Sequence, residues 1–451
     1  MARIRVNNKK GWLIVMSIFV LNFFIFGIIH AFSLVFVNLQ REFNATATTL
    51  GSIGSVTSAA VSFMTPISCL LYELTSHRSV SIIGVFLCSI GVLTSSFVND
   101  VRLLMLTFSF IYGTGANFLY NPLFNLVSYY FPEKQSARVT SLGSAGASLG
   151  ALTLTPLMNM LFPLCGWRVL FQCYSGVIFV IGLACCKPLS SPPQIHIKSP
   201  KNERRASNKD NSNIRNKYMK YICILKTWEH WLFNFGVAFG ASAVFFYLFF
   251  LVSVVESFDI SSEKASTQVI ILSAAQILGR GFCVLFGDKL PVSRPMALAI
   301  NSIIGAASSV LLFFNGSYTQ IAVSTSVTGF AIGFYFSLIY AAGIEVFGLE
   351  RNSESVAYTI ISIGLSTLTI PFLYGTSYDN TGSYSISILT STIVWILSSV
   401  FFTFTTIYHK RLSRRFQSLN NTSSIDHKTN DTIGDIRLRL ENEAEVGEEL
   451  L

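Results

Sequence analysis

Long runs of apolar residues, separated by short polar breaks, repeat along almost the whole chain. Each run is about 20 residues or slightly longer, which is the length that an α-helix needs to cross a bilayer. Hydrocarbon offers no hydrogen bonds, so the backbone of each run must bond within itself, as a helix does. The runs fall near Trp12–Leu39, Leu50–Tyr72, Val80–Val98, Leu103–Ser128, Val139–Phe162, Val169–Cys186, Trp228–Val255, Ala265–Phe286, Pro295–Phe314, Gln320–Val346, Ser355–Thr376 and Ser385–Tyr408. The pattern therefore predicts an all-α membrane protein with twelve transmembrane helices.

A polar, basic segment divides these runs into two sets of six. Its prolines and its excess of lysine and arginine predict a flexible linker, and positive charge beside spans is typical of cytoplasmic loops. The predicted organisation is a cytoplasmic N-terminus (1–11), an N-terminal six-helix half (12–186), a basic cytoplasmic linker (187–227), a C-terminal six-helix half (228–408) and a disordered cytoplasmic tail (409–451). Both termini are then cytoplasmic, and we expect the plasma membrane.

Composition agrees with this organisation and excludes several function classes. The chain is 51% hydrophobic and 12% charged, about half the charge of a soluble domain. Its net charge of +9 sits in loops beside the spans, so it does not indicate nucleic-acid binding. The cysteines show neither paired spacing nor histidine partners, which argues against a metal site. The sequence lacks a nucleotide-binding loop and the usual hydrolase motifs, so we expect neither an enzyme nor a cofactor.

Two sequons test the topology. Asn44 begins Asn-Ala-Thr after the first span, and Asn315 begins Asn-Gly-Ser after the ninth. Both loops are external in the predicted topology, so we expect glycosylation at Asn44 and Asn315.

Two halves of six spans joined by a long cytoplasmic segment resemble the major facilitator superfamily, and several motifs resemble its monocarboxylate transporter family. These motifs are Asn121-Pro122 and Tyr130-Phe131, Ala145-Gly146 with Gly150, Gly166-Trp167-Arg168 with Phe171, Gly279-Arg280, and Glu345-Val346-Phe347-Gly348. The resemblance covers nearly all of 12–408. Several family positions differ, including the turn before the fifth span, so the chain is identified as a divergent member.

The resemblance implies a secondary transporter of a small organic anion, either a monocarboxylate or an aromatic amino-acid-like solute. The implied partners are that anion, the lipid bilayer and, optionally, a single-span accessory glycoprotein. Arg280 resembles the family's anion-binding arginine, and His30 resembles a histidine of the branch that carries thyroid hormones and aromatic amino acids. Proton-coupled members carry an aspartate four residues before the arginine, where this chain has Gln276. An amide cannot carry a proton as a carboxylate does, which puts proton coupling in doubt.

The residues also suggest a binding site directly. Arg280 lies well inside the eighth span, where a guanidinium is costly unless paired and where charges mark substrate paths. The alternative is a structural arginine paired with a carbonyl oxygen or a glutamate, and His30 has a similar alternative. Further candidates for the cavity wall are Phe26, Asn121, Gln276, Phe334 and Tyr335, although aromatics at helical spacing more often only pack.

Loop charges suggest a conformational role. Glu73, Arg78 and Asp288 resemble a degraded form of the superfamily's Gly-x-x-x-Asp-Arg loop motif, and Glu345 is expected in the same cytoplasmic network. We expect these residues to gate rather than to bind the solute. The alternative function is a non-transporting sensor or accessory protein on a transporter fold, and a membrane-embedded enzyme ranks below it.

Overall fold

The computed structural model describes residues 8–30, 43, 47–131, 136–189, 225–314, 317–348 and 351–423. Within these ranges, 12 helices are long and apolar enough to cross a membrane. The prediction of an all-α membrane protein with twelve transmembrane helices is confirmed. Large apolar side chains, such as those of Leu103, Ile303 and Phe404, remain exposed on the outside of the bundle, as expected where lipid is the solvent.

The first half contains six spans, several of which are interrupted. Its elements are α1 (Asn8–His30), α3 (Ala47–Phe63), α4 (Thr65–Leu74), α5 (His77–Ser95), α6 (Val101–Leu104), the π-helical η1 (Met105–Tyr112), α7 (Gly113–Tyr130) and α8 (Ser136–Cys186). Pro66 at the start of α4 separates α4 from α3. In α8, Gly166 has a φ of 74° and separates the fifth span from the sixth.

The second half is more regular. Its elements are α10 (Trp228–Glu256), α11 (Ser262–Phe286), α12 (Arg294–Phe313), α13 (Tyr318–Phe347), α14 (Asn352–Ile370), the π-helical η4 (Pro371–Gly375), α15 (Thr376–Thr381) and α16 (Ser385–Ser423). The described part of the chain differs from the predicted organisation at α16, which continues past Tyr408 to Ser423. No proline or glycine interrupts 385–423, so the helix propagates beyond its apolar part.

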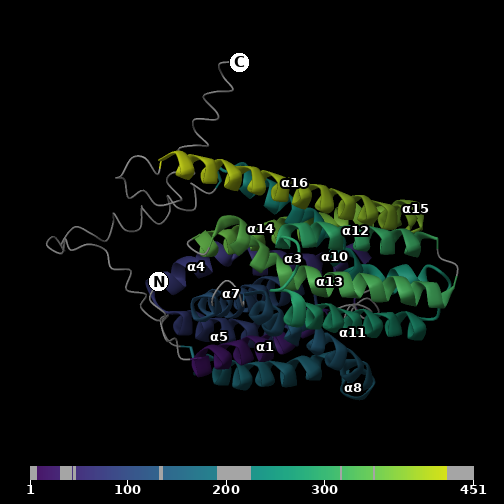
Figure 1. The fold of residues 1–451 in the computed structure, drawn as a ribbon. Coiled ribbons are helices and arrows are strands. Elements are labelled where there is room, and N and C mark those ends of the chain that lie inside the picture. The colour runs from purple at the N-terminus through teal and green to yellow at the C-terminus, as the bar shows by residue number, and fades with distance from the viewer. Residues whose placement is uncertain are drawn as a thin grey trace.

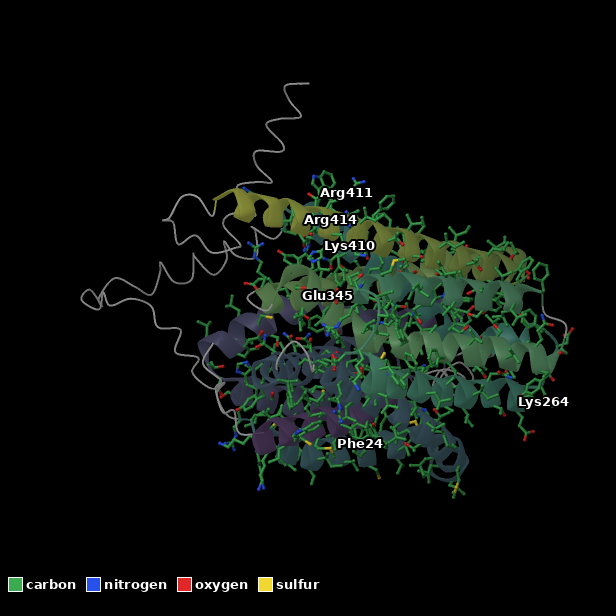
Figure 2. All side chains as sticks on the ribbon, in the orientation of Figure 1. Phe24, Lys264, Glu345, Lys410, Arg411 and Arg414 are labelled. Atoms are coloured by element: carbon green, nitrogen blue, oxygen red, sulfur yellow. The ribbon has the colours of Figure 1, made fainter. Side chains whose placement is uncertain are left out.

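Both ends of the helical bundle carry distinct features. The start of α1 and the end of α16 lie at the same end, which we call the termini end (Figure 1). Lys410, Arg411 and Arg414 lie toward it, whereas Lys264 lies at the opposite end (Figure 2). The side chains of Lys264, Lys410, Arg411 and Arg414 are all exposed, so these charges lie where the helices leave the apolar layer.

Glycines spaced four residues apart bring two pairs of helices close together. Gly146 and Gly150 of α8 lie against the backbone of α1, and Gly329 and Gly333 of α13 lie against that of α11. A Cβ at any of these positions would come within 3.0 Å of a backbone atom of the partner helix. Small residues at such spacing are the usual device for close helix packing in membranes. These contacts hold α8 close to α1 and α11 close to α13. Helices α8 and α11 then face one another across the two halves.

Candidate functional site

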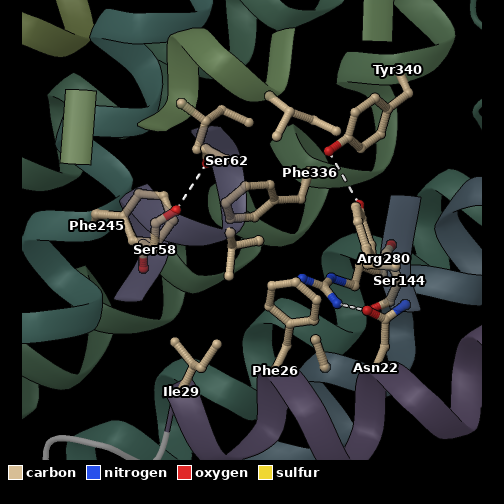
Figure 3. Close-up of a pocket in the computed structure, with 15 residues that line it drawn as sticks. Asn22, Phe26, Ile29, Ser58, Ser62, Ser144, Phe245, Arg280, Phe336 and Tyr340 are labelled. Atoms are coloured by element: carbon tan, nitrogen blue, oxygen red, sulfur yellow. Dashed lines mark hydrogen bonds between the residues drawn. The ribbon is translucent and has the colours of Figure 1, made fainter. Parts of the chain in front are cut away.

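A cavity of about 90 Å³ lies between the two halves. Helices α1, α3, α7 and α8 line it from the first half, and α10, α11, α13 and α14 line it from the second (Figure 3). The lining residues are Asn22, Phe26, Ile29, Ser58, Val61, Ser62, Tyr120, Ser144, Ala147, Phe245, Arg280, Phe336, Tyr340, Ile360 and Ile363. The wall is therefore mainly apolar, with a few polar groups converging on one space, as is typical of small-molecule sites.

Arg280 of α11 supplies the cation of this wall. Its side chain is 2% exposed, and Nη1 donates a hydrogen bond to the carbonyl oxygen of Ser144 on α8 (Figure 3). Its Nε has no hydrogen-bond partner, and no carboxylate lies within salt-bridge distance of Arg280 in the described ranges. A guanidinium carries five N–H donors that match a carboxylate, so this group retains donors for an anion.

Helices α8 and α11 run past one another through a series of contacts between the halves. One turn from Arg280, the Gln276 carboxamide oxygen accepts a hydrogen bond of 2.9 Å from Ser148 Oγ. Gln276 Nε2 is buried without a partner. Toward the termini end, Asp288 Oδ2 accepts a hydrogen bond of 3.2 Å from the backbone amide of Arg138. These contacts join the two halves along α8 and α11.

A pair of tyrosines also joins the halves at the cavity wall. The hydroxyl of Tyr120 on α7 donates to the hydroxyl of Tyr340 on α13 at 3.1 Å (Figure 3). The ring of Phe26 packs edge-on against Tyr120, with centroids 5.2 Å apart. Tyr340 also lies near Phe124, at 5.8 Å between centroids. The pair therefore combines apolar walls with a hydroxyl group that faces the cavity.

The structure brings some of the sequence candidates together and separates others. Arg280 and Phe26 line the cavity, and Gln276 lies one turn from Arg280 but outside the lining. Asn121 is buried in the first half, where its Nδ2 lies 3.3 Å from Cys69 Sγ. His30 is the last residue of α1, and its side chain lies outside the described part of the chain. The ligand role of each residue stays a prediction.

Phe334 and Tyr335 point away from the cavity, into the packing of the second half. Phe334 packs against Phe282 of α11, with centroids 6.1 Å apart. The Tyr335 hydroxyl donates to the carbonyl oxygen of Val237 on α10 at 2.8 Å. Phe336 and Tyr340 occupy the cavity face of α13 instead. Because α13 is apolar on all sides, the sequence contained no signal for which side faces the other half.

The sequence indicated Asn22 of α1 as a helix–helix contact and did not include it among the candidates for the cavity wall. Asn22 lines the cavity and donates through Nδ2 to the carbonyl oxygen of Gly143 on α8, at 3.0 Å. Its position one turn before Phe26 was a usable signal, because residues four apart share a helix face. Among the described residues, no group of three or more His, Cys, Asp or Glu side chains is placed to hold a metal ion.

The predicted gating residues fall at the termini end. Arg294, which was not among the predicted gating residues, lies 3.2 Å from Asp288 and 3.8 Å from Glu345. Arg78 is exposed at the start of α5, and the side chain of Glu73 lies outside the described part. Asn44 and Asn315 also lie outside the described ranges. Asp288 therefore contacts Arg294 within the second half and the backbone amide of Arg138 on α8 in the first half.

Two helical halves around a shared cavity with a buried cation define a membrane carrier. Comparison with known proteins agrees with this class: the sequence profile of the Major Facilitator Superfamily matches residues 15–366. The chain therefore belongs to the Major Facilitator Superfamily. Within it, the chain is a divergent multi-pass transporter that is similar to the monocarboxylate transporters, and it is not an enzyme.

The relatives support this placement at low identity. Monocarboxylate transporter 1 of Homo sapiens is 25% identical over 427 residues, covering 87% of this chain and 84% of the relative. Monocarboxylate transporter 10 of Homo sapiens is 21% identical over 434 residues, covering 92% and 82%.

Two solved structures share the fold. The proton:xylose symporter XylE has a TM-score of 0.69 at 13% identity, covering 88% of this chain and 95% of that chain. The E. coli fucose:proton symporter FucP has a TM-score of 0.61 at 14% identity, covering 87% and 99%. At these identities the likeness concerns the fold alone.

Proposed function

We propose that the protein transports a small monocarboxylate by alternating access, with Arg280 holding the carboxylate group. The observation that carries this proposal is a buried guanidinium at the cavity wall that has an unpartnered Nε and no carboxylate beside it among the described residues. An unpaired buried charge is costly, and a bound anion removes that cost through charge-assisted hydrogen bonds. A bound anion is thus the partner that the described residues do not supply.

The size and lining of the cavity favour a small solute. A single water needs about 10–15 Å³ of such space, so about 90 Å³ accommodates a solute of a few heavy atoms. Phe26, Phe245 and Phe336 offer apolar surface for the rest of the molecule. Between the two solute classes that the sequence left open, these features favour a short monocarboxylate over an aromatic amino-acid-like solute.

We also propose the plasma membrane, with both termini in the cytoplasm. The gathering of Lys410, Arg411 and Arg414 near the termini end supports this orientation, because cytoplasmic loops are enriched in basic residues. Asn44 and Asn315 would then face outward as glycosylation sites. A loss of apparent mass on treatment with an endoglycosidase that is smaller in Asn44→Gln than in the wild type tests the first of them. An accessory glycoprotein stays a prediction from the family resemblance.

Uptake of labelled monocarboxylates into proteoliposomes that contain the solute on both sides tests the transport proposal. Arg280→Gln should lower the transport efficiency at least about 30-fold, because loss of one partner of a buried charge pair costs about 2–5 kcal/mol. Arg411→Gln, at an exposed position of α16, is the matched control and should transport normally. Equal uptake by wild type and Arg280→Gln would refute the role of Arg280. Binding without any flux would favour the sensor alternative.

A further inference from the structure

Among the lining residues that the structure describes, the cavity wall carries a single formal charge. Arg280 is a cation, and the other 14 lining residues are apolar or carry only a hydroxyl or carboxamide group. Helix α11 therefore contributes the charged group, and the other lining helices contribute neutral groups. With a monovalent anion bound, the charge at the site sums to zero, and without it the charge is +1.

Among the described residues, no group around Arg280 would neutralise its charge. The described ionisable side chains that interact electrostatically with Arg280 are the Tyr120 hydroxyl and the Cys283 thiol, both uncharged near pH 7 in their ordinary state. From α1 and α8 it faces the Asn22 carboxamide and the Ser144 carbonyl oxygen.

The acidic groups of α11 and α13 lie elsewhere. Asp288 follows the end of α11, two turns beyond Arg280, and Glu345 lies near the end of α13. Both lie against Arg294, at 3.2 Å and 3.8 Å. One turn from Arg280, where a carboxylate could form an intrahelical ion pair, the chain has the neutral Gln276. The described groups around Arg280 thus leave its charge uncompensated.

The charge of Arg280 affects the loaded and the empty carrier differently during a transport cycle. When the cavity opens to one side, water can hydrate the guanidinium. When the halves close, as around the 2% exposed Arg280 seen here, that water must leave. With an anion bound, the closing carrier encloses a neutral pair, but an empty carrier must enclose a lone cation, which is strongly disfavoured. The empty carrier should therefore change its orientation slowly.

We propose that this protein is an obligatory exchanger of monovalent organic anions, in which each half-cycle requires a bound anion. This inference rests on the proposed function, because it assumes that Arg280 binds the solute carboxylate. It adds the mode of transport: one monocarboxylate enters as another leaves, with no net movement of charge or protons. A dianion leaves the closed site at −1 and is a poor substrate for the same reason.

Uptake of a labelled monocarboxylate into proteoliposomes tests the inference directly. One set of vesicles holds the same unlabelled monocarboxylate, and a second set holds only an impermeant buffer. The inference expects uptake at least about tenfold faster into the loaded vesicles, since each 1.36 kcal/mol of added barrier lowers a rate about tenfold. An inside-alkaline pH gradient should leave uptake into the empty vesicles unchanged.

A second test restores a compensating charge. In Gln276→Glu, the carboxylate one turn away pairs with Arg280 in the empty carrier and takes up a proton when the solute anion occupies the arginine. Net uptake into empty vesicles should then rise at least about tenfold relative to exchange and should increase as the external pH falls. Gln276→Met is the matched control: it has a similar volume and no charge, and should keep the exchange mode.

The outcomes separate this inference from the function on which it rests. Equal uptake into loaded and empty vesicles by the wild type would overturn obligatory exchange while leaving monocarboxylate transport intact. An unchanged ratio of net uptake to exchange in a folded Gln276→Glu variant would also overturn it. If the wild type moves no monocarboxylate even with the solute on both sides, the proposed function itself fails.

Discussion

Substitution of Gly333 by alanine should disturb the site without touching the cavity. Gly333 lies where α13 crosses α11, and an added Cβ would lie 2.9 Å from both the Cα and the carbonyl carbon of Gln276. It would come closer still to the Gln276 carbonyl oxygen. Ordinary Cβ contacts begin at 3.4 Å, so the backbone of α11 must retreat by at least about 0.5 Å. Arg280 lies one turn along the same helix and should move with it.

The expected effect of Gly333→Ala follows from that displacement. Overpacking should lower stability by about 1–3 kcal/mol. A misplacement of about 1 Å can cost about a hundredfold in an active site, so a shift of about half that size should lower exchange of a monocarboxylate about tenfold. The assay is labelled-anion exchange in proteoliposomes, normalised to the amount of folded protein, with thermal unfolding in detergent measured in parallel.

A matched control is available on α11 itself. Gly281 has no atom within 4 Å of an added Cβ, so Gly281→Ala should transport normally and should be as stable as the wild type or more so. If Gly333→Ala exchanged anions as fast as Gly281→Ala, the close approach of α11 and α13 would not position Arg280, and the reasoning would be refuted.

Three further predictions concern contacts between the halves. Tyr340→Phe removes the hydroxyl contact with α7 and should raise the KM for the monocarboxylate about two- to tenfold, and an unchanged KM would contradict a role at the cavity wall. Asp288→Asn weakens the carboxylate contact with the backbone amide of Arg138 near the start of α8, so labelling of engineered cysteines at the termini end should quicken about two- to fivefold; equal labelling rates would refute this. Gly364→Ala inserts a Cβ against Ser62 on α3, so it should lower the unfolding temperature and slow exchange, whereas Gly176→Ala, which meets nothing within 4 Å, should not.

Much of the fold could be predicted from the sequence because the bilayer imposes a simple rule. Apolar runs of sufficient length predict spans wherever they occur, and their number and order were confirmed. Helix ends were less predictable: α16 continues to Ser423 because propagation does not stop where hydrophobicity does. The interruption of the fourth span by η1 also had no clear signal, since no proline lies within Met105–Tyr112.

The candidate site was predictable only where a residue was out of place in an apolar run. Arg280 could be found in this way, since a cation inside a span is costly and usually marks a functional site. Phe26 was proposed as a wall residue, and it lines the cavity. On α13 the sequence offered Phe334 and Tyr335 as wall candidates with packing as the alternative, whereas Phe336 and Tyr340 face the cavity. Hydrophobic periodicity cannot orient a helix that is buried on all sides.

The sequence by itself determined that the chain crosses the membrane in two sets of six helices and that one cation lies among them. It did so because transfer of charge and of backbone polar groups into hydrocarbon is governed by local composition. Only the tertiary structure decided what surrounds that cation. Contacts of Arg280 with Ser144 and of Gln276 with Ser148 join residues more than a hundred positions apart. Such pairings depend on how closely glycine-bearing helices approach and rotate, which no local pattern encodes.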